Sequence, residues 1–284
     1  MIERKILIFT TCYNEAANIG PLIDDIAFVA PGADILVIDD SSPDGTWQVV
    51  EKKKEQYPQL RAILRPGKLG IGSAHKYAIF YAMREGYDTL LTMDADFSHD
   101  PQDIPALLQM SGPDAFVIGS RYCRGGKSDY QGSRAYISRL GNWLARTLLR
   151  LEIKELTTYF RVFDVKSLYS LPWRKIKSDG YSYGMQLIYY LSRSGVALKE
   201  APIHFKNRKA GKSKIPKMQV IYSLIDLFHL TVESFWKSVD SSPYVLVDNA
   251  CAHCKVGILT LKSTGKQLEM PVYTCLHCGR EQKL

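Results

Sequence analysis

The sequence predicts an α/β fold, in which a mostly parallel sheet is flanked by helices, followed by a small separate module at the C-terminus. Two observations lead to this prediction. Short apolar runs alternate with helical patterns through roughly the first 120 residues, which is typical of βαβ units. Two Cys-x-x-Cys pairs follow residue 250. The chain has 284 residues, of which 46% are hydrophobic and 23% are charged, so it can bury a large core.

Strands and helices are predicted to alternate in the first part of the chain. The strands are expected at 5–10, 34–39, 60–64, 89–94 and 115–119, and the helices at about 16–30, 45–57, 70–86 and 101–110. In open sheets of this kind, ligands bind outside the carboxyl ends of the strands. The residues that directly follow each strand are therefore the first candidates for a site.

Further helices are predicted at 133–150, 181–194 and 216–238. The last of these is rich in apolar residues, but Asp226, His229 and Glu233 interrupt it, which argues against a membrane span. A helix docked on the core is the preferred interpretation, and a helix lying on a membrane surface is the alternative.

The net charge of +8 favours anionic partners, such as phosphates, nucleic acid or an acidic membrane surface. The apolar run at 6–9 is too short for the core of a signal peptide, and no run of about 20 apolar residues occurs. We therefore expect a cytoplasmic protein that is peripheral at the cytoplasmic face of a membrane.

Two carboxylates, Asp94 and Asp96, end the fourth predicted strand. Residues two apart in an extended chain point the same way, so this pair suits a hard divalent cation, Mg²⁺ or Mn²⁺, that also binds phosphate oxygens. A solvated turn with a helix cap is the alternative, although Asp100, directly before Pro101, fits the capping role better. The adjacent carboxylates at 39 and 40 end the second strand, and a cation would relieve the repulsion among such groups.

Several motifs together carry a resemblance to a known family. They are YNE at 13–15, DDSSPDGT at 39–46, GIGSA at 70–74, MDADFSHDP at 93–101, GSRY at 119–122, FRVF at 160–163, GYSYGMQ at 180–186 and RKAGKSK at 208–214. The sequence resembles family 2 glycosyltransferases of the GT-A fold, which is Rossmann-like, and among them the polyprenol-phosphate (dolichol-phosphate) mannose synthases. The resemblance covers about residues 5–235.

The resemblance implies roles for individual residues. The donor would be bound by Tyr13, Glu15, Asp39, Asp40, Asp94 and Ala95, and the metal by Asp94 and Asp96. The phosphates would be cradled, and the chemistry supported, by Asp96, Arg121, Arg134, Arg208 and Lys214. The residues independently favour phosphate binding in the last segment, because basic side chains surround Gly211 and such a loop can close over a diphosphate.

The implied reaction is an inverting transfer of a sugar, most simply mannose from GDP-mannose, to a polyprenyl phosphate. A lipid monophosphate is already largely dianionic at neutral pH, so it needs orientation and charge screening rather than a general base. Another donor such as UDP-glucose, or a glycan acceptor, is an alternative. A non-catalytic protein that binds nucleotide sugars or nucleic acid, or acts as an adaptor, is an alternative of a different class.

The sequence departs from the family pattern at three places. Tyr159 stands where relatives carry Gly before Phe-Arg, Gly184 and Gln186 replace a Gln and a Glu, and Glu155-Leu156 replaces Asp-Pro. All three lie on the acceptor side of the expected site.

The C-terminal module is predicted to be a zinc ribbon, since two Cys-x-x-Cys knuckles make a tetrahedral site for a structural Zn²⁺. Its ligands would be Cys251, Cys254, Cys275 and Cys278, with strands at 256–261 and 269–274 between the knuckles. The expected domains are the transferase at 1–238, a linker at 239–250 and the ribbon at 251–284. A docking role toward a protein or a membrane is expected for the ribbon, and nucleic acid is the less favoured partner.

Overall fold

A computed structural model describes residues 4–209, 218–236, 246–250, 258–262, 272–275 and 281–283. Its centre is a seven-stranded sheet with the order β3-β2-β1-β4-β7-β5-β8. The strands are β1 (Ile6–Cys12), β2 (Asp34–Asp39), β3 (Leu60–Leu64), β4 (Thr89–Asp94), β5 (Ala115–Ser120), β7 (Arg161–Asp164) and β8 (Ala197–Pro202). Only β7 runs antiparallel to its neighbours within this sheet, which confirms the predicted mostly parallel α/β fold.

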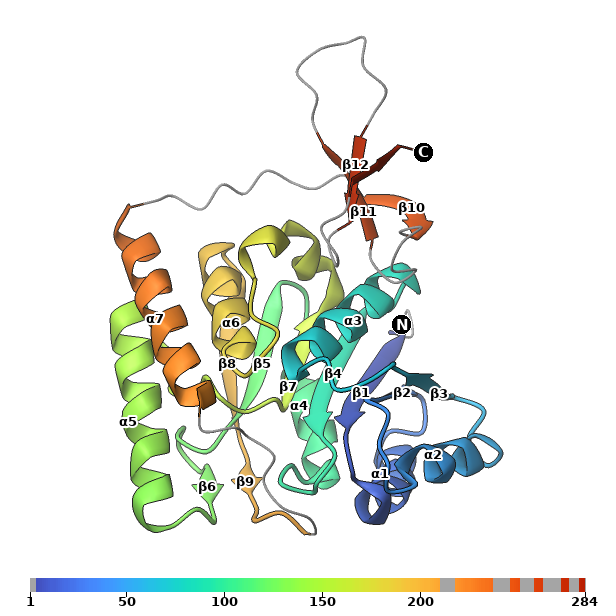
Figure 1. Ribbon diagram of the computed structural model, residues 1–284. Helices are drawn as coiled ribbons and strands as arrows, with labels where there is room; N and C mark the ends of the chain where they lie inside the picture. The colour runs from blue at the N-terminus through green and yellow to red at the C-terminus, as the bar shows by residue number, and fades with distance from the viewer. Residues whose placement is uncertain are drawn as a thin grey trace.

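Helices cover both faces of the sheet (Figure 1). They are α1 (Ala16–Val29), α2 (Thr46–Lys54), α3 (Ile71–Arg84), α4 (Ile104–Met110), α5 (Gly132–Leu149), α6 (Tyr183–Arg193) and α7 (Met218–Trp236). Short 3₁₀ turns, η1 (Pro101–Asp103), η2 (Val165–Ser170) and η3 (Trp173–Lys175), complete the helical elements. The Asp100 side chain accepts from the backbone N–H of Gln102, as the predicted helix cap requires.

Two apolar clusters, one on each face of the sheet, form the core. Successive strand residues point to opposite faces. Leu7 and Phe9 of β1 therefore join the cluster beneath α3 and α6, whereas Ile8 joins the cluster beneath α1 and α4. Burial on both faces explains why these strands are short continuous apolar runs.

Helix α7 packs on the α6 side of the molecule, beside α5 (Figure 1). Its apolar Leu227 and Leu230 enter the core, and the Ser182 hydroxyl donates to Asp226. Glu233 accepts from Lys175 at 2.9 Å and from the Tyr190 hydroxyl at 2.7 Å. The helix therefore docks on the core, which was the preferred interpretation of its sequence. Among the described helices, none is both long and apolar enough to cross a membrane.

Two smaller sheets complete the structure. Strands β6 (Lys127–Ser128) and β9 (His204–Phe205) pair in parallel. The C-terminal strands β10 (Leu246–Ala250), β11 (Ile258–Lys262), β12 (Val272–Cys275) and β13 (Glu281–Lys283) form an antiparallel sheet. Both strands predicted for the C-terminal module are present, and β10 lies within the segment that was expected to be a linker.

Candidate active site

The predicted donor and metal residues follow strands whose carboxyl ends share one edge of the sheet (Figure 1). The register places Asp39 of β2 opposite Cys12, and Asp94 of β4 opposite Thr11. The end of β1 therefore lies between two strands that each end in a carboxylate. Parallel pairing thus assembles side chains from sequence-distant segments, as the strand-end rule predicts.

Asp94 ends β4, and Asp96 lies in the loop that follows it. The side chain of Asp94 is 30% exposed, whereas Asp96 is buried. One carboxylate oxygen of Asp96 accepts from the Ser98 N–H at 2.9 Å, and Phe97 between them has a φ of 64°. A non-glycine residue in this region is unfavourable, so the loop is held against a local conformational preference.

His99 is a site residue to which the sequence analysis assigned no role, although it lies in the MDADFSHDP motif. Its ring is fully buried, stacks on Phe160 and accepts from the backbone N–H of Asp94 through Nδ1 at 3.0 Å. Burial lowers the pKa of His99 to about 3, so the ring is neutral and carries its proton on Nε2. That Nε2 lies 3.8 Å from the Asp94 carboxylate.

Arg208 reaches these carboxylates from the segment after β9. One terminal nitrogen lies 2.8 Å from Asp96, and the other lies 3.4 Å from Glu15. The backbone N–H of Lys209 also donates to the Asp96 carbonyl at 3.1 Å. The structure therefore brings Glu15, Asp96 and Arg208 together, and Arg208 is the counter-ion of the carboxylates in this state.

Asp94 and Asp96 place two negative charges close together, which affects the pKa of Asp94. Burial, and next the negative charge of Asp96, raise the pKa of Asp94, although Arg208 acts in the opposite direction. Such a group favours a cation at its oxygens. Within the described ranges, no cluster of three or more His, Cys, Asp or Glu side chains is arranged to hold a metal ion.

The end of β2 contributes two further predicted donor residues, Asp39 and Asp40, which differ in their surroundings. Asp39 accepts from the Ser42 hydroxyl and backbone N–H. Asp40 is bound instead by Arg65, whose Nε lies 2.5 Å from it. Arg65 also donates to the Ser73 hydroxyl at 2.7 Å. Arg65 directly follows β3, so inspection of the third strand end would have found it.

The remaining predicted donor residues lie around the end of β1. The ammonium of Lys68 lies 4.8 Å from the centre of the Tyr13 ring. Glu15 is buried and accepts from the Asn18 side chain at 2.7 Å. Ala95, between the two metal candidates, is also buried. Direct contact of these residues with a donor stays a prediction.

Comparison with known proteins identifies the family. Residues 7–171 match the family described as "Glycosyl transferase family 2". The chain belongs to glycosyl transferase family 2. Undecaprenyl-phosphate mannosyltransferase of Micrococcus luteus is 30% identical over 236 residues, which cover 83% of this chain and 97% of that protein. Polyprenol monophosphomannose synthase of Mycolicibacterium smegmatis is 32% identical over 217 residues, or 75% of this chain and 81% of that protein.

Solved structures support the fold independently. Glucosyl-3-phosphoglycerate synthase of Mycobacterium tuberculosis, in complex with Mn²⁺, UDP and glucosyl-3-phosphoglycerate, has a TM-score of 0.55 at 21% identity. The similarity covers 86% of this chain and 85% of that one. The same enzyme with Mn²⁺, UDP-glucose and phosphoglyceric acid has a TM-score of 0.58 at 19% identity. At this level of identity, the likeness concerns the fold.

Arg121, predicted as a phosphate ligand of this glycosyltransferase, lies in a buried ion pair. It donates to both carboxylate oxygens of Glu155, at 2.7 and 2.9 Å, and to the Thr157 hydroxyl at 2.6 Å. Glu155 is the residue that departs from the usual Asp-Pro. Its longer side chain satisfies Arg121 bidentately, so the charge of Arg121 is already compensated. A phosphate contact by Arg121 stays a prediction.

Two residues that depart from the family pattern, Tyr159 and Gly184, both contact the buried cation Arg161. The guanidinium of Arg161 lies 4.7 Å from the centre of the Tyr159 ring and donates to the Gly184 carbonyl at 3.2 Å. A Cβ on Gly184 would lie 2.6 Å from an Arg161 nitrogen. The large residue at 159 and the glycine at 184 are therefore parts of one packing arrangement.

We expect Gly184→Ala to lower the free energy of unfolding by about 1–3 kcal/mol, because the new methyl group must displace a packed guanidinium. Chemical denaturation measures this change. Gly141→Ala in α5 is the matched control, since no atom lies within 4 Å of its added Cβ. An equal loss in both variants would contradict the packing explanation. A smaller loss from Gly184→Ala in a Tyr159→Ala background would support it.

Some predicted residues lie where the structure gives no side-chain description. Arg134 falls in the first turn of α5, but its side chain is not described. Lys214, Cys251, Cys254 and Cys278 lie outside the described residues, and Cys275 ends β12 without a described side chain. The zinc site therefore stays a prediction.

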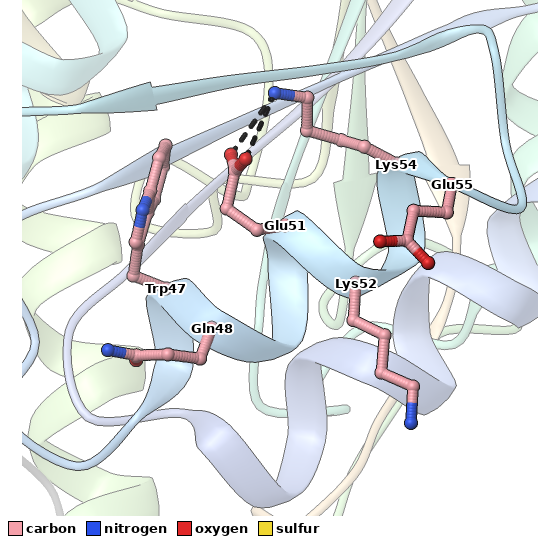
Figure 2. Close-up of a pocket in the computed structure, with 6 residues that line it drawn as sticks. All are labelled: Trp47, Gln48, Glu51, Lys52, Lys54 and Glu55. Atoms are coloured by element: carbon pink, nitrogen blue, oxygen red, sulfur yellow. Dashed lines mark hydrogen bonds and ion pairs between the residues drawn. The ribbon is translucent and has the colours of Figure 1, made fainter.

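The hollow in Figure 2 is lined by residues of α2 and the following Glu55, and by none of the strand-end carboxylates.

Proposed function

We propose that this glycosyltransferase transfers mannose from a nucleotide-linked donor to a polyprenyl phosphate. One observation carries the proposal: Asp94, Asp96 and Arg208 converge at the strand ends of a chain that covers 97% of an undecaprenyl-phosphate mannosyltransferase. Both curated relatives described above are named for mannose and a polyprenyl lipid. GDP-mannose is the simplest donor for this reaction.

The residues at the site fit a divalent cation, Mg²⁺ or Mn²⁺. Asp94 presents a partly exposed carboxylate, and burial together with the negative charge of Asp96 raises its pKa despite the nearby Arg208. Carboxylate oxygens are the ligands that such hard cations prefer. Asp94 and Asp96 would hold the ion, which would stabilise the negative charge of the departing nucleoside diphosphate.

The chain's own residues orient the reactants. His99 fixes the backbone at Asp94 through its 3.0 Å hydrogen bond, and Ser98 fixes the Asp96 carboxylate. Arg208 is partly exposed, so its guanidinium can exchange a carboxylate for a phosphate group. A phosphate acceptor supplies its own nucleophilic oxygen, so no general base is required of the protein.

The proposal also covers the cellular location of the enzyme and the role of its C-terminal module. A polyprenyl acceptor resides in a membrane, so we place the protein at the cytoplasmic membrane face as a peripheral enzyme. A structural zinc bound by Cys251, Cys254, Cys275 and Cys278 would stabilise the C-terminal module, which would serve in docking to a protein partner. The cysteine spacing is the support for this part of the proposal.

The test uses purified full-length protein with Mg²⁺ or Mn²⁺, a short polyprenyl phosphate, and either GDP-mannose or UDP-glucose. We expect metal-dependent formation of lipid-linked mannose from GDP-mannose. Product from UDP-glucose alone would overturn the assigned sugar. Turnover only with a saccharide acceptor would overturn the assigned lipid phosphate.

A further inference from the structure

The buried ring of His99 has one nitrogen without a hydrogen-bond partner among the described residues. Its Nδ1 accepts from the backbone N–H of Asp94 at 3.0 Å, so Nδ1 carries no proton and the neutral ring carries its proton on Nε2. The Nε2 atom is shielded from solvent, yet nothing in the described part of the chain accepts from it. A buried donor that makes no hydrogen bond is unfavourable, so this atom indicates a bond that forms in another state of the site.

The group that faces this nitrogen is the carboxylate of Asp94. One carboxylate oxygen lies 3.8 Å from Nε2, which is beyond the roughly 2.7–3.2 Å of an N–H···O hydrogen bond. The side chain of Asp94 is 30% exposed, whereas that of His99 is fully buried. Of the two groups, the carboxylate therefore has the freedom to move.

The ring of His99 is held in place by aromatic neighbours. It stacks on Phe160, with ring centres 5.0 Å apart and an interplanar angle of 20°, and it meets Phe205 edge-on at 5.4 Å. Phe160 directly precedes β7 and Phe205 ends β9, so two elements that are remote in sequence fix the ring. The hydrogen bond at Nδ1 also restrains rotation of the ring. The direction of the Nε2–H bond is thus set by the fold.

A neutral donor suits a carboxylate that binds a cation. Arg208 lies 2.8 Å from Asp96, and a positive partner of this kind competes with a metal ion for the carboxylate. The neutral imidazole of His99 adds no positive charge, so it can orient Asp94 without such competition. One oxygen of Asp94 would accept from the ring, and the other would remain for the ion. Hydrogen bonds of this kind orient the carboxylate ligands of metal sites.

We propose that His99 is a positioning residue of the metal site, whose Nε2–H donates to the Asp94 carboxylate when a divalent cation is bound. Both ring nitrogens would then act on Asp94, one on its backbone and the other on its side chain. This inference rests on the cation in the proposed function and names a residue that organises its site. Its tests measure no sugar transfer, so a wrong assignment of mannose or of the polyprenyl phosphate would leave it standing.

The variant His99→Asn separates the roles of the two ring nitrogens. The amide oxygen of asparagine can replace Nδ1 as an acceptor, but the shorter side chain has no donor at the position of Nε2. Calorimetric titration of the donor-free full-length protein should show about 10–100-fold weaker binding of Mn²⁺ than in wild type. His75→Asn is the matched control, because His75 is also a buried histidine, packed against Phe9 and Tyr159. Its affinity for Mn²⁺ should be unchanged.

Circular dichroism and thermal midpoints establish that both variants are folded. Binding of Mn²⁺ by folded His99→Asn as tight as in wild type would overturn the proposal, because the backbone contact would then be sufficient. An equal loss in His75→Asn would also overturn it, since the effect would then arise from any cavity in the core. A wild-type protein that binds no Mn²⁺ would contradict it as well.

A spectroscopic measurement tests the wild-type protein without any substitution. Isotope labelling of the histidine ring nitrogens allows their protonation to be read by nuclear magnetic resonance, and the signal missing from His99→Asn identifies His99. Without metal, we expect the proton on Nε2. Saturation with Mg²⁺, which is diamagnetic, should move the Nε2 proton signal downfield, as a new hydrogen bond to a carboxylate does. An unmoved signal, or a proton on Nδ1, would overturn the proposal.

Discussion

Replacing Asp96 with Asn should reduce sugar transfer by at least about a hundredfold, since changes to residues that merely support metal ligands already cost 10–100-fold. The substitution keeps the size of the side chain and removes its charge. Asp96 accepts from Ser98 and lies 2.8 Å from Arg208, so the loss of charge also releases that arginine. The measurements are the rate of lipid-linked mannose formation and calorimetric titration with Mn²⁺. We expect the affinity for Mn²⁺ to fall together with the rate.

Arg208→Ala separates the role of the metal from the role of the arginine. It removes a cation that competes for Asp96, so the affinity of the donor-free protein for Mn²⁺ should be unchanged or higher. Transfer should nevertheless fall by about 10²–10³-fold, as expected for the loss of a group that stabilises developing charge. Weaker Mn²⁺ binding by Arg208→Ala would contradict this assignment, and would mean that the arginine organises the metal site.

Replacing Glu155 with Ala should lower the free energy of unfolding by about 3–5 kcal/mol, because it leaves Arg121 as a buried charge without its partner. Glu155 is 0% exposed and binds Arg121 bidentately. Urea denaturation measures the change. Glu51→Ala is the control, because the Glu51–Lys54 pair lies in the exposed hollow of Figure 2 and is expected to contribute about 0–1 kcal/mol.

The double variant Arg121→Met/Glu155→Leu distinguishes a lost attraction from an uncompensated charge. Apolar replacement of both partners should recover most of the stability, as in other buried pairs. A double variant as unstable as Glu155→Ala would show that the hydrogen bonds themselves stabilise the fold.

The Arg121–Glu155 pair should also make the free energy of unfolding depend on pH. Burial alone would raise the pKa of Glu155, but the hydrogen bonds and charge of Arg121, together with hydrogen bonds from Thr157, lower that pKa.

Because the folded pKa of Glu155 is depressed, its stabilising contribution is complete above the unfolded value of about 4.5. It is lost as the pH falls through the lower folded value. The difference in stability between wild type and Glu155→Ala should therefore shrink only in acid.

Of the seven strands of the central sheet, the sequence analysis predicted five, each of which contains a run of mostly apolar residues, and it missed β7 and β8. Strand β8 (ALKEAP) lies at the edge of the sheet and has two adjacent charged residues at its centre, so it has no apolar run. Strand β7 is only four residues long and contains Arg161. Its strand conformation comes from pairing with β4 on one side and β5 on the other. Local pattern cannot reveal an element whose stability derives from neighbours distant in the sequence.

Some features of the candidate site, likewise, could be predicted from the sequence and others could not. Spacing and strand-end position were sufficient to select Asp94 and Asp96, because the period of a strand and the parallel order of βαβ units follow from local sequence. The motifs also indicated the family, which the comparisons confirm. The sequence by itself therefore determined the fold class and the family, and it selected the carboxylates to test.

Only the tertiary structure decided which cation faces which carboxylate. Arg208 contacts Asp96 across more than one hundred residues, and Arg121 is bound to Glu155 rather than left free for a phosphate. Likewise, the inward carboxylates of α7 left its apolar side exposed. Charge pairing and the choice of the buried helix face depend on distances between elements that are remote in sequence. Those distances exist only once the sheet and its helices have packed.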